Sequence, residues 1–480
     1  MRSAQRLEAM LWLAVYACGA GLAFLAGWRM QVSYEYFQLL GREPLASRLA
    51  ESLFNLHAQP PLLNLLLGLA LKLERATGLA PERSLLALHL ALGAAITLAL
   101  YILLVRLGVT PWLRRLALAV ILLDPAFYSF VLDFFYPLHE LFLLTLAAVA
   151  VERFLATRRP EFYVAACACL VALAYTRALF HPVWIVAVLL MLALPARRPD
   201  RERSPVFAAL AASLVLLLAW PVKNYVRFGV FGFSSWQGYN LSQGLVDRYP
   251  PIWDAFVFGS LPSQESAREA LARSVPERFR AIPVLADPLK APGVPNWNHA
   301  AIIPLSRRLE SLVLRRLREH PALLAAKAAE NYRQAAIYPA RNPYAADLDW
   351  RARTPLARFW LTFYESTVYL YRGDDPQSGP LPGFAWILPP ALLLALVQIV
   401  RRRKRDPVGA GTTAFLLAAI LWVLAMVLLV DGREGNRIRF STQPLLYLAV
   451  AWSLTRSSSM IPETDGRATF DRSADRSAKP

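Results

Sequence analysis

The sequence predicts an all-α polytopic membrane protein with about ten transmembrane helices, an outer juxtamembrane helix at about 60–74 and a large, mainly helical outer insert. Hydrophobic residues make up 56% of the 480 residues, and the mean hydropathy is +0.37. They occur in blocks of about 18 residues or more with almost no internal charge, long enough to cross about 30 Å of hydrocarbon as a helix. A helix also satisfies its own backbone polar groups in lipid.

The apolar blocks define ten predicted spans, each of which ends where charged or turn-forming residues begin. They lie near residues 10–28, 84–105, 115–132, 139–156, 161–177, 181–196, 206–222, 383–400, 410–430 and 441–455. Two arginines precede the first block and no small-residue cleavage site follows it, so we expect a retained span rather than a signal peptide. The cysteines Cys18, Cys167 and Cys169 lie inside apolar blocks, which is typical of packing residues and implies no disulfide or metal motif.

Arginine-rich short loops set the predicted orientation. The loops 106–115, 152–162, 196–204 and 401–406 all fall on the side of the N-terminus when the ten spans are counted. Lys and Arg in short loops mark the cytoplasmic side, so the N-terminus is predicted to be cytoplasmic. The net charge of +18 is explained by this orientation, and nucleic-acid binding is not predicted.

The stretch "HAQPPLLNLLLGLALKL", which begins at His57, also resembles the start of a span. If residues 60–74 crossed the membrane, every later loop would change sides and the arginine-rich loops would face outward. We therefore predict a helix that lies along the outer surface or dips into it, as interfacial helices do.

Four regions follow from this topology. Residues 1–222 form an N-terminal membrane module with a first outer loop at 29–83, and residues 223–382 form an outer, periplasmic insert. Residues 383–455 return to the membrane. The Ser-, Asp- and Arg-rich residues 456–480 are predicted to be a disordered cytoplasmic tail.

Within the insert, leucines recur at helical spacing between arginines over residues 305–334. This pattern predicts either a helix on the membrane surface that faces anionic head groups or an ordinary solvated amphipathic helix. The residues alone do not separate these two alternatives.

Charged and polar residues gather in the outer turns. The candidates are Glu35, Glu43, Glu51, His57, Gln59, Asp133, His139, Glu140, Arg177, His181, Lys223, Asn224, Arg227, Asp431, Arg433, Glu434, Arg437 and Arg439. Charge near the membrane boundary is costly unless it is paired or functional. Arginines suit a phosphate held by forked donors, and carboxylates suit a general base or a metal. The combination predicts a site for an anionic lipid headgroup.

Structural interpretations compete with this one. His139, Glu140 and Asp133 can serve as helix-end residues, the last-turn arginines as interface anchors, and His57 as a hydrogen-bond partner of the Pro-Pro turn. Asp124 is predicted to cap a break before Pro125. No Walker loop, zincin motif or G-x-S-x-G elbow is present.

Four segments together carry a family resemblance. They are "HAQPPLLNLLLG" after the first outer loop, "YPLHELFLLTLAAVA" at the second outer turn, "WPVKNYVRFGVFGFSSWQGYNL" leaving the seventh span, and "EGNRIRFSTQPLLYLAVAW" opening the last. In their order and topology they resemble the membrane glycosyltransferases of the GT-C superfamily, in particular the protein-mannosyltransferase, aminoarabinose-transferase and Rgt-like bacterial group.

The resemblance implies that a sugar moves from a polyprenyl-phosphate carrier to a lipid, glycan or protein acceptor on the outer side of the membrane. In this family an acidic first-loop residue activates the acceptor hydroxyl or helps to hold a metal. The resemblance therefore leaves open whether the protein uses a divalent cation as a cofactor. That residue is usually aspartate, but this loop has none, and Glu35, then Glu43, are the best-placed substitutes. Glu140 matches the second acidic position.

The implied site therefore has Glu35, Glu43 and Glu140 as catalytic candidates. The implied substrate-binding residues are His57, Gln59, His139, Arg177, Lys223, Asn224, Arg433, Arg437 and Arg439. The high Arg and Ala content indicates a GC-rich bacterial genome, which would place the protein in the inner membrane with its site facing the periplasm. Two alternatives stay open: a transporter or lipid flippase for an anionic glycolipid, and a non-catalytic relative that acts in assembly.

Overall fold

The computed structural model describes residues 3–194, 200–243, 245, 246, 249, 251–257, 260–337, 354–367, 383–429 and 435–455. Within these residues the protein is all-α apart from one short antiparallel hairpin, β1 (Leu289–Ala291) and β2 (Val294–Pro295). The all-α character predicted from the sequence is therefore confirmed. The predicted tail, residues 456–480, lies outside the described residues.

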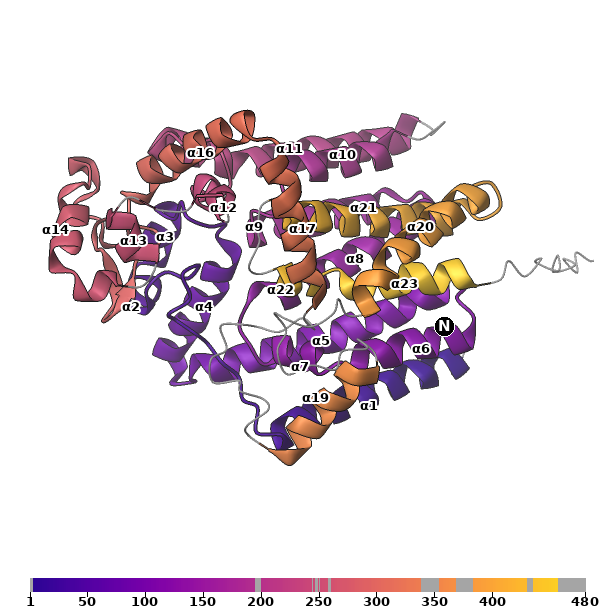
Figure 1. Ribbon diagram of the computed structural model, residues 1–480. Coiled ribbons are helices and arrows are strands. Elements are labelled where there is room, and N and C mark those ends of the chain that lie inside the picture. The colour runs from indigo at the N-terminus through magenta and orange to yellow at the C-terminus, as the bar shows by residue number, and fades with distance from the viewer. Residues whose placement is uncertain are drawn as a thin grey trace, which may run out of the picture.

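One part of the molecule is a bundle of apolar helices that lie side by side (Figure 1). Its members are α1 (Ser3–Leu25), α5 (Pro81–Arg106), α6 (Pro111–Leu122), α8 (Tyr136–Thr157), α9 (Pro160–Thr176), α10 (Pro182–Ala193), α11 (Asp200–Phe228), α20 (Gly383–Arg402), α21 (Pro407–Leu429) and α23 (Gln443–Leu454). In the described part of the chain, four helices are long and apolar enough to cross a membrane: Ser3–Leu25, Pro81–Arg106, Ser204–Phe228 and Pro407–Leu429. The protein is a membrane protein by this criterion, and the number of ten spans stays a prediction.

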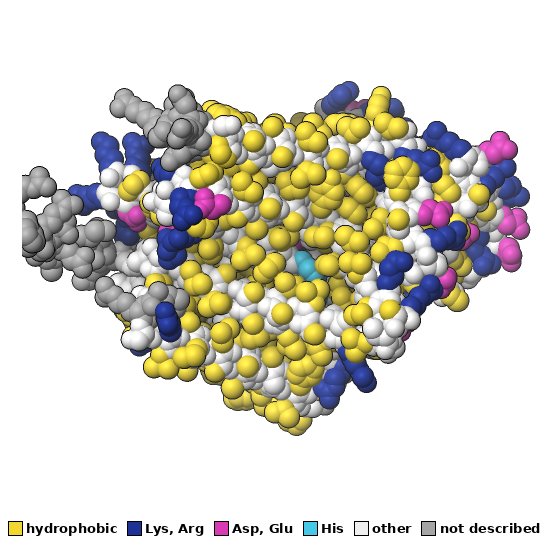
Figure 2. Space-filling model, turned by 180° about the vertical axis from the view of Figure 1, so that it is seen from behind, with side chains coloured by type: hydrophobic (Ala, Val, Ile, Leu, Met, Phe, Trp, Pro, Cys, Tyr) yellow, Lys and Arg dark blue, Asp and Glu magenta, His cyan; other side chains and the backbone are white. Residues whose placement is uncertain are grey.

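The surface of the bundle is apolar, as expected of helices whose solvent is lipid. Helix α11 exposes Phe207, Val215, Leu216, Leu218, Val222, Tyr225 and Val226, and α20 exposes Trp386, Ile387, Leu393, Leu396 and Val400. Figure 2 shows a broad band of hydrophobic side chains across one face, with Lys and Arg gathered toward its two ends. A continuous apolar surface of this kind marks a membrane or protein interface.

The second part, here called the head, consists of the described residues within 30–79 and 229–319, which gather at one end of the bundle (Figure 1). Its helices are α2 (Arg42–Ser47), α3 (Leu49–Phe54), α4 (Leu62–Thr77), α12 (Gln237–Ser242), α13 (Pro251–Val257), α14 (Glu265–Arg273), α15 (Pro283–Ala286) and α16 (Ile302–Glu319), with the 3-10 turns η1 (Leu261–Ser263) and η2 (Glu277–Phe279). The head has its own hydrophobic core, to which residues of both segments contribute.

Helix α4 is the segment predicted to lie on the outer surface. It has 16 residues and is about 24 Å long, shorter than the hydrocarbon thickness of about 30 Å. One of its faces, which includes Leu63, Leu67 and Leu71, is buried where α4 packs against α2, α3 and α5. It is therefore part of the head, in agreement with a helix that does not span.

The opposite end of the bundle, here called the arginine end, carries ion pairs between helix termini. Glu8 near the start of α1 accepts hydrogen bonds from Arg114 at 2.6 Å and from Arg115 at 3.1 Å. Arg106 pairs with the buried Glu152. The turn after α20 lies at this end as well (Figure 1). The arginine-rich turns at 106–115 and 401–406 thus share an end with the N-terminus, as their charge pattern predicts.

The predicted span at 115–132 is not one helix. Helix α6 ends at Leu122, and α7 (Pro125–Val131) begins after a break at Asp124. The Asp124 carboxylate accepts a hydrogen bond from the Ala126 backbone N–H at 2.8 Å, and Pro125 has no N–H to continue the helical hydrogen bonding. The capping role predicted for Asp124 is confirmed, so the segment predicted to span at 115–132 is a broken helix.

The predicted insert at 223–382 is also divided. Helix α11 continues to Phe228, and the leucine-arginine pattern at 305–334 breaks between His320 and Pro321 into α16 and α17 (Ala322–Ile337). Helix α17 packs against α21 of the bundle. In α19 (Pro355–Thr367), Trp360 stacks on Trp28 at a ring-centroid distance of 5.5 Å. Only the first part of the insert therefore belongs to the head.

The two ends of the bundle are expected on opposite sides of the membrane. Ser266 in the head and Lys404 at the arginine end are both exposed, so each can be replaced by cysteine in a variant that lacks Cys18, Cys167 and Cys169. A membrane-impermeant maleimide added to intact cells should label Ser266→Cys, and should label Lys404→Cys only after the cells are lysed. Labelling of both positions in intact cells would contradict this orientation.

Candidate functional site

A buried ion pair lies where the bundle meets the head. Glu140 lies in the second turn of α8, and Arg177 directly follows α9. An Nη1 atom of Arg177 lies 3.5 Å from Oε1 of Glu140, and the two side chains are 11% and 0% exposed. The guanidinium also lies over the Tyr136 ring, 5.6 Å from its centroid. Two residues that the sequence assigned separately to catalysis and to phosphate binding are thus in contact.

Local sequence explains how these two side chains meet. Pro137 starts α8, since its fixed φ suits the first turn of a helix, and this places Glu140 close to the positive end of the helix dipole. Helix α9 ends at Thr176, and the backbone of Arg177 is extended, with φ −149° and ψ 135°. Helices α8 and α9 pack as neighbours, so the end of one lies beside the start of the other.

Two histidines contact each other nearby. His139, next to Glu140 in the chain, has its ring centroid 4.9 Å from that of His89 in α5. Each Nδ1 lies within hydrogen-bond distance of a backbone carbonyl, Phe135 for His139 at 3.0 Å and Val131 for His89 at 3.2 Å. A carbonyl only accepts, so Nδ1 carries the proton in each ring and Nε2 has the lone pair.

Sequence reasoning missed His89, although the signal was present. An ionisable residue inside an apolar span is by default a candidate functional residue, and His89 lies within the apolar helix α5. Neither histidine's Nε2 makes a hydrogen bond within the described part of the chain. The described part of the chain contains no group of three or more His, Cys, Asp or Glu side chains that could hold a metal ion. The divalent cation therefore stays a prediction.

A narrow pocket lies among α17, α20, α21 and α23, and its empty space of about 400 Å³ includes open solvent. It is lined by Ala335, Leu388, Ile420, Val423, Leu424, Val427, Arg439, Thr442, Gln443 and Leu446. Its walls are mostly aliphatic, and Arg439 of α22 (Gly435–Phe440) brings the positive charge to this lining. An Nη1 atom of Arg439 donates a hydrogen bond to the Ala335 carbonyl at 2.6 Å. The lining therefore offers aliphatic contacts and one cation, and its enclosed space of about 30 Å³ has room for about two water molecules.

The helix that carries Arg439 lies close to the elements around Glu140. Helix α22 packs against α8, and its Phe440 ring lies 4.3 Å from that of Phe130 in α7, centroid to centroid. Of the other predicted arginines, Arg433 lies outside the described residues, and Arg437 is described only as a member of α22. The third outer turn and the last one are therefore both next to α8.

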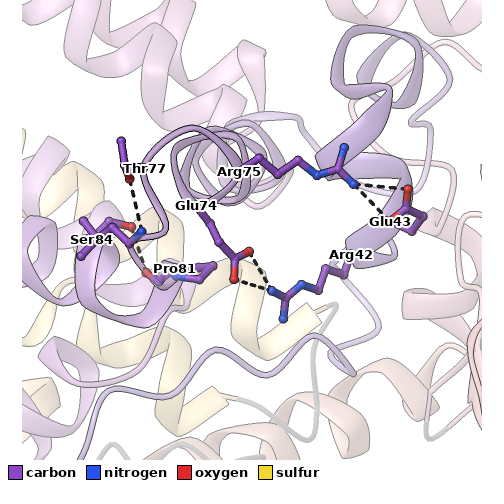
Figure 3. A network of polar contacts seen from close by, with 8 residues as sticks. Arg42, Glu43, Glu74, Arg75, Thr77, Pro81 and Ser84 are labelled. Carbon is purple, nitrogen blue, oxygen red and sulfur yellow. Dashed lines mark hydrogen bonds and ion pairs between the residues drawn. The ribbon is translucent and has the colours of Figure 1, made fainter.

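The two first-loop glutamates belong to the head. Glu43 is exposed and pairs with Arg75 of α4 at 3.3 Å, beside the pair of Arg42 and Glu74 at 2.7 Å (Figure 3). These contacts tie α2 to α4. Glu35 is exposed on the head. No hydrogen bond or ion pair joins either glutamate to Glu140 or Arg177 in the described residues, so the membership of all three in one catalytic site stays a prediction.

The position of Glu35 does have an electrostatic consequence. It faces Lys290 of the β-hairpin, whose ammonium donates hydrogen bonds to the carbonyls of Tyr36 and, at 2.8 Å, Leu39. Burial lowers the pKa of Lys290 to about 7, and the Glu35 carboxylate partly opposes this shift. Lys290 thus fastens the hairpin to the first loop, which is a structural contact inside the head.

The remaining predicted residues connect the head to α11. The imidazole Nδ1 of His57 lies 2.7 Å from the Ser235 hydroxyl, and the ammonium of Lys223 donates to the Leu56 carbonyl at 2.6 Å. Asn224 donates to the Gly232 carbonyl at 2.8 Å. His57, Asn224 and Gln59 are all buried. His57 therefore bonds to Ser235 rather than to the Pro-Pro turn, and this group attaches the "HAQPPL" segment to the bundle.

The buried His57 makes stability depend on pH. Burial, and then the charge of Lys223, lower the pKa of His57 to about 3, while an unfolded chain has about 6.5. Between these values the unfolded state binds more protons, so stability is complete above about pH 6.5 and falls as the pH drops toward 3. Between pH 6.5 and 5 this amounts to about 2 kcal/mol.

We expect His57→Gln to reduce the loss of stability between pH 7 and pH 5, as measured by thermal unfolding in detergent. Burial also lowers the pKa of His299 to about 4, so His299 accounts for part of the pH dependence of stability that remains in this variant. The control is His320→Gln, because His320 is exposed. Equal pH slopes for the wild type and His57→Gln would contradict the prediction.

The ion pair of Glu140 and Arg177 should show strong coupling. Removing one partner leaves a buried charge, so Glu140→Gln and Arg177→Gln should each lower the free energy of unfolding by about 3–5 kcal/mol. The double variant should lose less than the sum, by about 1–3 kcal/mol. Thermal unfolding of the four proteins in detergent measures this cycle, and additive losses would show that the pair is not coupled.

Comparison with protein-family models and with curated proteins finds no match to this chain. The function is therefore argued from the residues and their arrangement.

Proposed function

We propose that the protein is a membrane glycosyltransferase that moves a sugar from a polyprenyl-phosphate carrier to a lipid, glycan or protein acceptor at the head end of the bundle. The observation that carries this proposal is the apolar pocket with Arg439 in its wall. A polyprenyl phosphate is a long apolar chain that ends in an anion, and this pocket offers both kinds of contact. Arg439 is also one of the positions that resemble the family motif.

The chemistry of such a transfer would give a role to the buried charged groups at the head end of the bundle. The acceptor hydroxyl attacks the anomeric carbon, the bond from that carbon to the phosphate oxygen breaks, and polyprenyl phosphate leaves. A carboxylate takes the hydroxyl proton, and guanidinium groups stabilise the negative charge that develops on the departing phosphate. We assign the first role to Glu140 and the second to Arg177 and Arg439.

Glu140 is preferred to Glu35 and Glu43 as the base because it is buried beside an arginine, whereas the first-loop glutamates are exposed. A water-excluded position makes electrostatic interactions with a phosphate stronger. In this proposal the head binds the acceptor. By the arginine pattern, it faces the periplasm of a bacterial inner membrane.

The transporter alternative predicts different features. Transporters commonly have repeated halves with charged residues near the middle of the membrane. Here the ion pair lies at the head end, and the sequence has no recognisable repeat. These features favour transfer over transport.

Release of free polyprenyl phosphate from a radiolabelled polyprenyl-phosphate sugar tests the proposal. We expect Glu140→Gln to lower the rate by at least about 100-fold, because proton transfer by a positioned group contributes about 10²–10⁴-fold. Arg177→Lys and Arg439→Lys should weaken use of the donor, since lysine lacks the forked donors. Glu35→Gln and Glu43→Gln should retain most activity.

The matched control is Glu152→Gln. Glu152 also forms a buried ion pair, with Arg106, but at the arginine end of the bundle. It should lose stability and keep its activity per folded molecule. Full activity in Glu140→Gln would remove Glu140 from the site. Absence of release by the wild type, with a crude acceptor extract present, would favour transport or an assembly role.

A further inference from the structure

Helix α16 in the head has one buried and one exposed face. Its buried face packs on α12, where the Ser306 hydroxyl accepts a hydrogen bond from the Gly238 backbone N–H at 3.0 Å. Leu309 and Val313 are fully buried on the same side. The exposed side chains are those of Arg307, Arg308, Ser311, Leu312, Leu314, Arg315, Arg318 and Glu319. The helix thus turns four arginines outward.

The order of these residues is unlike that of a solvated helix. At helical spacing they form two neighbouring rows, Arg307–Ser311–Leu314–Arg318 and Arg308–Leu312–Arg315–Glu319. Leu312 is 39% and Leu314 45% exposed, so each row contains an exposed leucine between charged residues. Arginine side chains beside exposed leucines are typical of a helix at a membrane surface, where the apolar groups enter the interface and the guanidiniums reach the phosphates.

This face adjoins the apolar surface of the bundle. The Arg307 guanidinium donates a hydrogen bond to the carbonyl of Gly229, the residue after α11 ends. Close to that point in the chain, Tyr225 is 60%, Val226 77% and Phe231 64% exposed. Exposed aromatic and aliphatic residues at the end of a spanning helix mark the membrane–water boundary. Arg307 therefore lies beside the end of a helix long and apolar enough to span a membrane.

The four exposed arginines of this face outnumber the acidic residues of the helix. Its exposed acidic residue is Glu319, and Glu310 accepts a hydrogen bond from Gln237 at 3.3 Å. The short-loop charge rule does not account for four arginines at the head end, because it applies to the opposite side and to short loops. A partner with several negative charges, arranged along a line at the membrane surface, would fit this face.

We infer that the exposed face of α16 binds the phosphates of anionic phospholipid headgroups and holds the head at a fixed position on the membrane. Phospholipid is favoured over a soluble acidic partner because the face is continuous with the lipid-facing end of α11 and contains exposed leucines. This inference does not depend on the proposed transfer reaction. It also selects the membrane-surface alternative for the first half of the pattern at 305–334.

The test uses the full-length protein in nanodiscs of phosphatidylcholine with 20% phosphatidylglycerol, about one lipid in five. Lipids that stay bound after extraction into mild detergent are counted by mass spectrometry. We expect the wild type to enrich phosphatidylglycerol over the bulk ratio. A variant with Arg307, Arg308, Arg315 and Arg318 all replaced by Gln should lose this enrichment by at least about tenfold, since each arginine near an anionic surface contributes a severalfold factor.

Two control variants show whether lipid enrichment depends on the position of the arginines in α16 or on net charge alone. The first replaces four other exposed head arginines, Arg48, Arg273, Arg278 and Arg280, by Gln, and should keep the enrichment. The second replaces the four α16 arginines by Lys and should keep most of it. Thermal unfolding identifies any variant that fails to fold. If the Gln variant of α16 does not fold, the folded Lys variant is still compared with the wild type.

Enrichment that survives the loss of all four α16 arginines would overturn the inference and identify α16 as a solvated helix. Equal losses in the α16 and control variants would also overturn it, because binding would then follow net charge. Capture of a soluble acidic polymer in preference to phosphatidylglycerol, measured by competition with polyglutamate, would replace the lipid by a different partner.

Discussion

The side chain of Asn298 makes four hydrogen bonds that hold together segments far apart in the chain. Its oxygen accepts from the backbone N–H groups of His57 at 2.9 Å and Ala58 at 3.1 Å, and its nitrogen donates to the carbonyls of Asn55 and Val284, both at 3.1 Å. Because all these groups are buried, an unmade bond would carry a full desolvation cost. The first loop can therefore form the head only with the later segment in place.

The position of the head decides what surrounds the end of α8. The same first-loop segment is attached to α11 through Lys223 and Arg227, which donates to the Asn55 side chain at 2.9 Å. Tyr36 of the head packs edge-on against Phe135, with a ring-centroid distance of 4.8 Å, directly before α8 begins. The buried charges of Glu140 and Arg177 thus lie beneath a folded cover rather than at an open surface, where water would weaken their interactions.

Buried carboxylates are paired with arginines at both ends of the bundle, but the two pairs lie in different surroundings. At the arginine end, ion pairs such as Arg106 with Glu152 join helix termini and are structural. At the head end, the Glu140–Arg177 contact is longer, 3.5 Å, and the helix α8 that carries Glu140 packs against α22, which carries Arg439. Burial is costly for both pairs.

Several features were predictable because they depend on neighbours in the chain. Apolar blocks predicted the helices, and the break before Pro125 followed from a capping aspartate and a missing N–H. Arginine-rich turns predicted which ends lie together. The failure also has a local cause, since the break at His320–Pro321 was overlooked. Motif resemblance assigned Glu35 and Glu43 to the site; both are exposed, and this assignment stays a prediction.

The sequence by itself determined that the protein is helical, is a membrane protein and carries charge in the turns between its apolar segments. These features can be read from composition and from the spacing of apolar and charged residues. Only the tertiary structure decided which of those charges meet. It joined Glu140 to Arg177 and His139 to His89, brought Asn298 to His57, and left Glu43 with Arg75 on the surface. The physical reason is that burial and contact between distant residues depend on helix packing, which no local pattern encodes.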